Sequence, residues 1–99
     1  MEMITAEELE QLIVEVRQEF QIPPYFPDNS LGNYIKEGYV RLKKLNPVSQ
    51  LEVDLDFRML LKNYVYYAYH HKVNEWESNY ASLILSWQLG SEVDIDGDS

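Results

Sequence analysis

The sequence predicts an all-α protein, a small bundle of three long helices, and three observations support this. Apolar residues recur at steps of three and four along most of the chain, which is the spacing of one helix face. All four prolines lie within 23–27 or at 47, and no proline or glycine interrupts residues 54–89. The helical pattern therefore falls into three segments, residues 5–20, 28–45 and 54–89.

The long segment from Asp54 to Leu89 is expected to break or kink near residues 70–74. Each half carries an apolar stripe, but at about 100° per residue the second stripe lies a quarter turn or more around from the first. Either one long helix presents two faces to two partners, or the helix breaks; we favour a break, which gives three to four helices. Asn74 with Glu77 could then cap the new helix. The first stripe is Phe57, Leu60, Leu61, Tyr64, Val65 and Ala68, and the second is Tyr69, Val73, Trp76, Tyr80, Leu83 and Trp87.

The first segment has the features of an amphipathic helix. Thr5 followed by Glu8 matches a capping box, in which each side chain accepts a hydrogen bond from the backbone N–H of the other residue. Apolar residues then repeat on one face, while charged residues point away from it. The apolar face consists of Leu9, Leu12, Ile13, Val16 and Phe20.

Two connections separate the predicted helices. The first, residues 22–28, has three prolines in five positions, so it cannot be helical and is expected to pack as an apolar lid over helix ends. The second, residues 46–53, opens with an Asn-Pro pair, and its Leu51 and Val53 are expected to tuck against the core or to form a short extended piece. Asp54 then caps the long segment.

The second helix is expected to have Asp28 or Ser30 as its cap and to run to about Leu45. Gly38 falls on its apolar face, where a glycine costs about 1 kcal/mol relative to alanine. The close approach of a neighbouring helix would account for that cost. The residues expected to point inward are Leu31, Tyr34, Ile35, Leu42 and Leu45.

Length and composition indicate a single domain. Residues 1–89 are expected to form one helical domain, and residues 90–99 an acidic, flexible tail. The 99 residues include no cysteine, which excludes disulfides and thiolate chemistry. No apolar run approaches the roughly 18 residues that can span a bilayer, and the N-terminal residues lack the pattern of a signal peptide. No association with a membrane is expected.

Acidic residues outnumber basic residues by 17 to 8, which gives a formal net charge of −9. Proteins that bind nucleic acid gain most of their affinity from lysine and arginine at phosphates, so no sequence-specific nucleic-acid binding is expected. The short cluster Arg41, Lys43 and Lys44 lies at a predicted helix C-terminus, where the helix dipole favours cations. An acidic surface would instead repel DNA that slides past it.

No set of residues points to catalysis, a cofactor or a metal. No known catalytic or phosphate-binding motif occurs, so the chain is not expected to be an enzyme. On a helix His70 and His71 would diverge by about 100°, and no other histidine or cysteine could complete a metal site with them. The acids from Asp94 to Asp98 alternate as in a calcium loop, but the sequence ends before the glutamate needed at the twelfth position, so a solvated tail is favoured. Capping explains the acids at the predicted helix starts, which are Asp28, Asp54 and Asp56.

The aromatic side chains exceed what one small core needs. Four tyrosines between 64 and 69 span nearly every face of a helix, so they cannot all enter one core. One interpretation is that their rings lie flat on the surface with the hydroxyls in water. Because surplus tyrosine and tryptophan also anchor protein interfaces, we favour a second interpretation, in which another face meets a neighbouring protein. The candidate interface residues are Tyr25, Phe26, Tyr66, Tyr67 and Tyr69.

A series of short motifs between about residues 9 and 89 is specific in its order and spacing rather than in any single piece. The motifs are Ile22-Pro23-Pro24-Tyr25-Phe26 with Asp28, then Gly38 and Leu42; Asp54 with Arg58, Leu60-Leu61-Lys62-Asn63-Tyr64 and Tyr67; and Glu75-Trp76-Glu77 with Asn79-Tyr80, Ile84-Leu85-Ser86 and Gln88-Leu89. With these motifs the chain resembles the small all-helical head–tail connector proteins, or adaptor and head-completion proteins, of tailed bacteriophages and prophages. It departs from the family pattern at Tyr66, where arginine is frequent, at Trp76, where phenylalanine is usual, and in its acidic tail.

The resemblance implies a helical subunit that assembles into a ring, dodecameric in the family, beneath the portal protein at the capsid vertex. Such a ring extends the DNA channel and receives the tail or a stopper protein, and it does so without chemistry or a cofactor. The protein would be made in the host bacterial cytoplasm and would reside in the virion at the head–tail junction. Two other hypotheses stay open: a small acidic adaptor or regulatory protein that binds one basic protein partner, and a DNA-binding helical domain.

Overall fold

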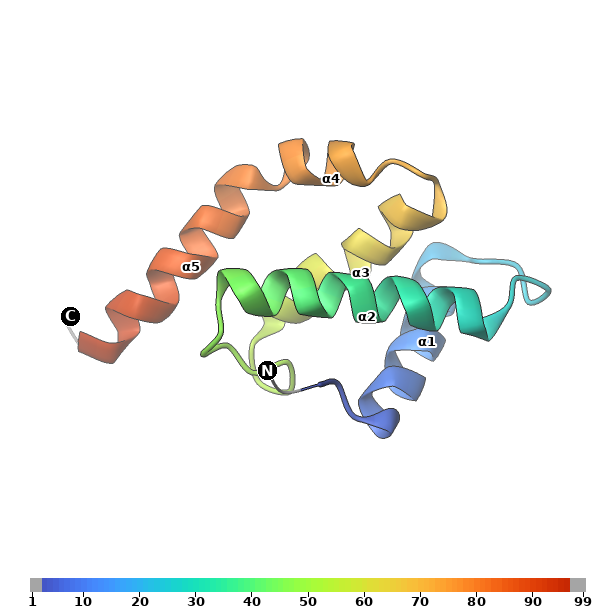
Figure 1. Ribbon diagram of the computed structural model, residues 1–99, viewed down its shortest axis with the longest axis horizontal. Helices are drawn as coiled ribbons and strands as arrows, with labels where there is room; N and C mark the ends of the chain where they lie inside the picture. Colours follow the sequence, from blue (N-terminus) through green and yellow to red (C-terminus); the bar gives the residue numbers. More distant parts are fainter. Residues whose placement is uncertain (1–2, 97–99) are drawn as a thin grey trace.

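The computed structural model describes residues 3–96, and within that range the chain forms five α-helices and no strand (Figure 1). The all-α prediction is confirmed. The number of helices exceeds the expected three to four because the last predicted segment breaks twice, near residues 70–72 and again at Tyr80. The helices are α1 (Ala6–Phe20), α2 (Asp28–Leu45), α3 (Leu55–Tyr69), α4 (Val73–Asn79) and α5 (Ala81–Asp96).

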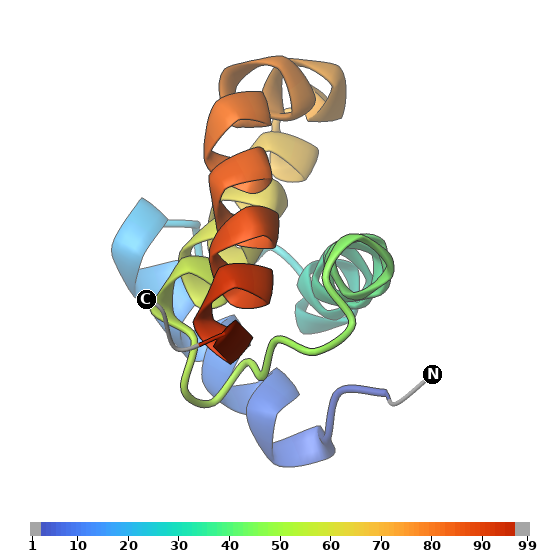
Figure 2. The same cartoon turned by 90° about the vertical axis from the view of Figure 1, so that its left-hand side faces the viewer.

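Helix α3 lies at the centre of the fold and contacts each of the other four helices. In Figure 1, α2 crosses in front of α3, α4 runs across the top, and α5 descends at the left to the C-terminus. Figure 2 shows α2 at the right and α1 along the lower left, on different sides of α3. The first apolar stripe of the long segment, from Phe57 to Ala68, is buried as predicted, so α3 supplies the middle of the core.

The ends of α1 and α3 follow the predicted capping chemistry. Thr5 and Glu8 form the reciprocal capping box, with Oγ1 of Thr5 accepting from the backbone N–H of Glu8 at 3.1 Å. Asp54 caps α3 by accepting from the backbone N–H groups of Asp56 and Phe57. The prediction for α2 is wrong, because Pro27 occupies the cap position and neither Asp28 nor Ser30 caps the helix. The carboxylate of Asp28 instead accepts a hydrogen bond from Arg17, which lies on α1.

The break after α3 is a hydrogen-bonded chain reversal rather than a capping box. His71 has a left-handed backbone with φ of 59°, its N–H donates to the carbonyl of Ala68, and the N–H of Lys72 donates to that of Tyr67. This is the Schellman arrangement, with histidine in the position usually held by glycine. The predicted cap at Asn74 is wrong, because Lys72 precedes the first residue of α4 and Asn74 lies inside the helix.

Helix α2 passes so close to α3 that only glycine fits at position 38, which confirms the expected close approach. A Cβ at Gly38 would lie 2.7 Å from side-chain atoms of both Leu61 and Tyr64. The end of α2 differs from the prediction. Leu45, expected to point inward, is exposed, whereas the nearby Lys43 is buried. The ammonium group of Lys43 is accommodated because it donates to the backbone carbonyls of residues 47 and 49.

Helix α5 is attached where α2 ends and α3 begins. The indole N–H of Trp87 donates to the carboxylate of Asp54 at 2.8 Å, and the side-chain amide of Gln88 donates to the carbonyl of Leu45, also at 2.8 Å. The helix continues past Gly90 to Asp96, so residues 90–96 of the predicted tail are helical. Residues 97–99 lie outside the described residues, and the flexibility of this segment stays a prediction.

Candidate interaction surface

Large apolar side chains are exposed on the connection between α2 and α3 and on α5. Val53 and Leu55 are 77% and 78% exposed, which is unusual for large apolar residues beside a core. Of the two alternatives for Leu51 and Val53, the first holds for Leu51, which is buried, but not for Val53, and residues 51–53 form a turn rather than an extended piece. We call these exposed residues together the apolar end; Val48, Val53 and Leu55 lie on or beside the connection, and Leu85 and Leu89 lie on α5.

The two leucines on α5 face away from the core because of their position around the helix. Leu85 and Leu89 are four residues apart and so lie on one side of α5, while Trp87 lies about 160–200° from both. Trp87 is buried, and the two leucines are more than half exposed. The sequence indicates this exposure, since Leu85 and Leu89 fall outside the apolar stripe of Tyr80, Leu83 and Trp87. The predicted interface residues are all aromatic and do not include the two leucines.

A groove runs between the connection and α5, and one of its two acidic residues, Asp54, is fully engaged in hydrogen bonds within the fold. Asp54 caps α3 with one oxygen and accepts from the Ser49 hydroxyl and the Trp87 indole with the other. Burial raises the pKa of Asp54, but these hydrogen bonds outweigh it, and the net pKa lies below its usual range. The groove offers a mixture of apolar and polar contacts. It is lined by Val48, Ser49, Gln50, Val53, Asp54, Leu55, Asp56, Ser86, Trp87 and Gly90.

The aromatic residues predicted for an interface have different environments in the structure. Tyr25 is 86% exposed, at the tip of the turn between α1 and α2. Tyr66 and Tyr69 are half-buried: Tyr66 stacks on Phe20 of α1 at a centroid distance of 4.5 Å, and Tyr69 meets the edge of Phe26 at 4.8 Å. The structure therefore absorbs much of the aromatic surplus internally. Tyr67 is also half-buried, with its hydroxyl accepting from Asn79.

Arg17 holds the turn that displays Tyr25. Its guanidinium donates to the carbonyls of Pro23, at 2.8 Å, and Phe26, and to the carboxylate of Asp28, at 2.7 Å. One cation thus ties both sides of the proline turn to the end of α1. The five donors of a guanidinium in a rigid plane suit this multiple contact. The tip of the turn keeps its shape while the Tyr25 side chain stays in solvent.

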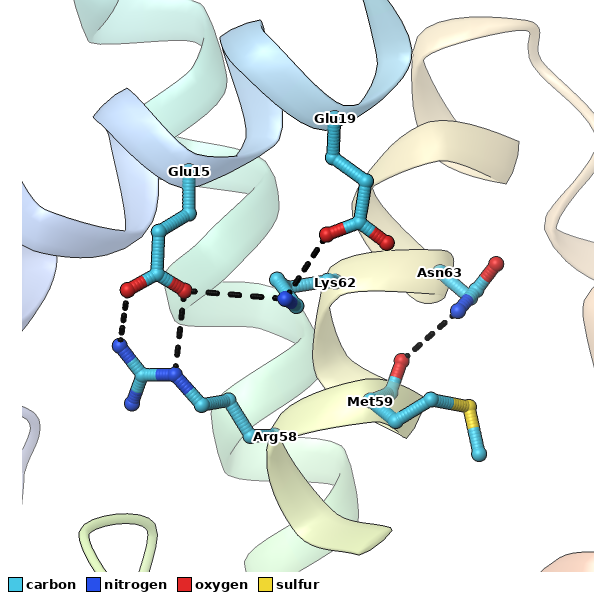
Figure 3. A network of polar contacts seen from close by, with 6 residues as sticks. All are labelled: Glu15, Glu19, Arg58, Met59, Lys62 and Asn63. Atoms are coloured by element: carbon cyan, nitrogen blue, oxygen red, sulfur yellow. Dashed lines mark hydrogen bonds and ion pairs between the residues drawn. The ribbon is translucent and has the colours of Figure 1, made fainter. Parts of the chain in front are cut away.

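A polar network on the other side of α3 ties α1 to α3 (Figure 3). Arg58 forms a two-pronged contact with Glu15, at 3.1 and 2.7 Å. Lys62 lies 2.8 Å from Glu19 and 3.7 Å from Glu15. The hydrogen bond from Arg58, followed by the positive charges of Arg58 and Lys62, outweighs burial and lowers the pKa of Glu15. The network fixes how α1 sits against α3.

Stability is expected to fall in acid because of this network. The folded pKa of Glu15 is depressed, so its stabilising effect is present above the ordinary glutamate value of about 4.3 and is lost as pH falls through the folded value. Glu15→Gln is therefore expected to give a shallower loss of unfolding free energy between roughly pH 5 and pH 2 in urea titrations. Glu10→Gln is the matched control on the same helix, where no ion pair is formed within the described residues. Equal slopes for the two variants would contradict the assignment.

No metal-ligand cluster is found among residues 3–96, where no group of three or more histidines and carboxylates converges. His70 and His71 lie at the junction of α3 and α4, and the ring of His70 packs edge-on against Tyr66 and Tyr69. The predicted alternating acids begin in the last turn of α5, and two of the five residues lie outside the described range. No helix in the described part of the chain combines the length and apolarity needed to cross a membrane.

Comparisons with models of known families, with curated proteins and with solved structures return no match for this chain.

Proposed function

We propose that the protein is a structural subunit of a phage or prophage head–tail connector ring. The observation that carries this proposal is the apolar end, where two segments far apart in the sequence place five large apolar side chains in solvent. A chain of this size gains nothing from that exposure when it is alone, and such surfaces mark sites of protein contact. The order and spacing of the sequence motifs, which resemble those of head–tail connector proteins, support a ring as the type of assembly.

In this role the subunits form a ring, dodecameric in the family, beneath the portal protein and receive the tail or a stopper protein on the other side. The groove between the connection and α5 could receive an apolar side chain of a partner against Val48, Val53 and Leu55, and the carboxylate of Asp54 in its wall is already satisfied by hydrogen bonds. The net charge of −9 suits a wall along which DNA slides without binding. The role requires no cofactor and places the protein in the virion.

The function is tested by mixing the protein with its portal protein and measuring particle masses by mass photometry. We expect portal particles to gain the mass of a ring of subunits. The pair of changes Leu55→Ser and Leu85→Ser is expected to weaken this association at least tenfold while leaving the helical circular dichroism unchanged, since both side chains are more than half exposed. Ser82→Ala, an exposed position on the same helix, is the control. Free portal and free monomer in the wild-type mixture would refute the proposal.

A second candidate function is a small acidic adaptor that binds one basic protein. It is favoured by a separate groove on α1, whose lining includes Glu7, Glu10 and Glu52 and no cation. An adaptor of this kind would form a one-to-one complex whose affinity falls steeply with salt, because exposed charges are screened within about 10 Å at 0.1 M salt. The apolar end would contribute little to such a complex. The Leu55 and Leu85 variant therefore separates the two functions.

A further inference from the structure

The outward side of α2 is basic, in contrast to the acidic balance of the chain. Lys36, Val40 and Lys44 are four residues apart and therefore lie on one side of the helix. Both lysines are exposed and form no ion pair within the described part of the chain. Arg41 lies beside them, pairs with Glu77, and has its guanidinium 5.6 Å from the centre of the Tyr64 ring. We call Lys36, Val40, Arg41 and Lys44 the basic face; they line a shared groove on α2 together with one acidic residue, Glu37, which accepts a hydrogen bond from the Tyr64 hydroxyl.

The outward side of α1 has the opposite charge. Glu7, Glu10 and Val14 follow one another at helical spacing, and Glu52 from the connection lies across the groove from them. The three glutamates are exposed and meet no cation among residues 3–96. Val14, at the same groove, is more than half exposed. These four residues form the acidic face, and they are distinct from Glu15 and Glu19, whose charges are used in the network with α3.

The two faces complement each other but cannot meet within one molecule. They line separate grooves that share no residue. The two helices pack against each other around Gly32, and Figure 2 shows α2 at the right and α1 at the lower left. Each face places one valine among charged side chains; those around Val40 are mostly basic, with Glu37 the exception, and those around Val14 are acidic. A second copy of the chain carries the complement of each face.

We infer that the basic face of one subunit docks on the acidic face of the next, with Val40 near Val14 and the lysines near the glutamates. Because two different faces of the same chain are joined, the contact is head-to-tail and repeats from copy to copy. The net charge of −9 makes two copies repel each other in general, and pairing the basic face with the acidic face offsets this repulsion in one orientation. The contact itself is argued from the two faces, and only its closure into a ring rests on the proposed function.

The strength expected of this contact is low for a single pair of subunits. Exposed ion pairs each contribute little and are screened by salt, and the apolar part is limited to a pair of valines with the stems of the lysines. The isolated protein is therefore expected to associate weakly and most readily at low salt. Copies held side by side on a template would form the contact through their high effective concentration.

Single cysteines test the geometry directly, because the chain has none of its own. Val14→Cys and Val40→Cys proteins are mixed at high concentration and low salt with a short bis-maleimide linker. We expect a cross-linked dimer in the mixture at a yield at least ten times that of either variant alone, and a ladder of oligomers from the double variant. Val14→Cys mixed with Ser82→Cys, an exposed position on α5 outside both faces, measures random collision.

Charge reversal then tests the cause of the contact. Lys36→Glu with Lys44→Glu in the Val40→Cys protein is expected to reduce cross-linking to the level of the Ser82 control. Glu7→Lys with Glu10→Lys in the Val14→Cys partner is expected to restore it. All four positions are exposed, so the variants are expected to keep the wild-type circular dichroism. Yields that do not differ from the Ser82 control, same-face dimers as the main product, or no response to charge reversal would each overturn the inference.

The outcome is separable from that of the portal experiment. A protein that assembles on the portal but gives no cross-link between positions 14 and 40 keeps the connector function and loses this contact. A protein that gives the cross-link but ignores the portal keeps the contact and loses the connector function.

Discussion

Replacing Trp76 by alanine is expected to cost about 3–5 kcal/mol of the free energy of unfolding. The Trp76 side chain is 1% exposed and is the largest of the fully buried side chains. Its ring meets the edge of Tyr64 at a centroid distance of 5.0 Å, and its indole N–H donates to the carbonyl of Leu60 at 3.2 Å. Because the short helix α4 reaches the core mainly through this residue, the loss combines a cavity, a lost hydrogen bond and the release of α4. Urea unfolding followed by circular dichroism gives the measurement.

Two neighbouring variants make this result interpretable. Trp76→Phe keeps an aromatic ring in the core and is expected to lose about 1–3 kcal/mol, since the Leu60 carbonyl loses its side-chain donor and the ring is smaller. Glu75→Ala changes an exposed residue of the same helix and is expected to fall within about 0.5 kcal/mol of wild type. If Trp76→Ala were as mild as Glu75→Ala, α4 would not be packed on α3 as described.

Alanine at Gly38 is expected to destabilise the protein by about 1–3 kcal/mol, although alanine is the better helix former. The added methyl group would lie 2.7 Å from Leu61 and 2.7 Å from Tyr64, and both side chains are buried in α3. Neither can move freely, so α2 must shift away from α3. This strain outweighs the roughly 1 kcal/mol that alanine gains over glycine within a helix. The midpoint of urea unfolding is the readout.

Gly32 provides a control on the same helix with the opposite expected sign. A methyl group there would lie 4.0 Å from the nearest side-chain atoms, those of Leu9 and Ile13, which is an ordinary contact distance. Gly32→Ala is therefore expected to stabilise the protein by about 0.5–1 kcal/mol. Stabilisation by Gly38→Ala would show that α2 lies farther from α3 than described, and destabilisation by Gly32→Ala would show that α2 lies closer to α1 than described.

The elements specified by local chemistry were predicted well. The capping box of Thr5, the cap at Asp54 and the buried stripe from Phe57 to Ala68 depend on neighbouring residues in the chain, which the sequence displays directly. The break after α3 was placed correctly, but its mechanism was not, because a left-handed histidine at 71 carries none of the glycine signal of a Schellman turn. The second break, at Tyr80, could not be predicted, because no proline, glycine or capping residue in the sequence indicates that the helix ends there.

The candidate surface was harder to predict because it depends on which helix covers which stripe. Tyr66 and Tyr69 looked surplus in the sequence, yet α1 and the proline turn supply Phe20 and Phe26 to pack against them. Val53 looked like a core residue, but the connection turns it outward while burying Leu51 two positions earlier. Periodicity shows that a face is apolar. It does not show whether another part of the chain reaches that face.

The clasp of Arg17 on the proline turn has a consequence for recognition. A loop usually becomes ordered when a partner binds its tip, and the conformational entropy that the loop loses lowers the affinity. Here the Arg17 guanidinium holds the backbone on both sides of Tyr25 by hydrogen bonds to the carbonyls of Pro23 and Phe26 before any partner binds. A partner that binds Tyr25 therefore meets a pre-organised turn, and the main conformational entropy lost on binding is that of the Tyr25 side chain.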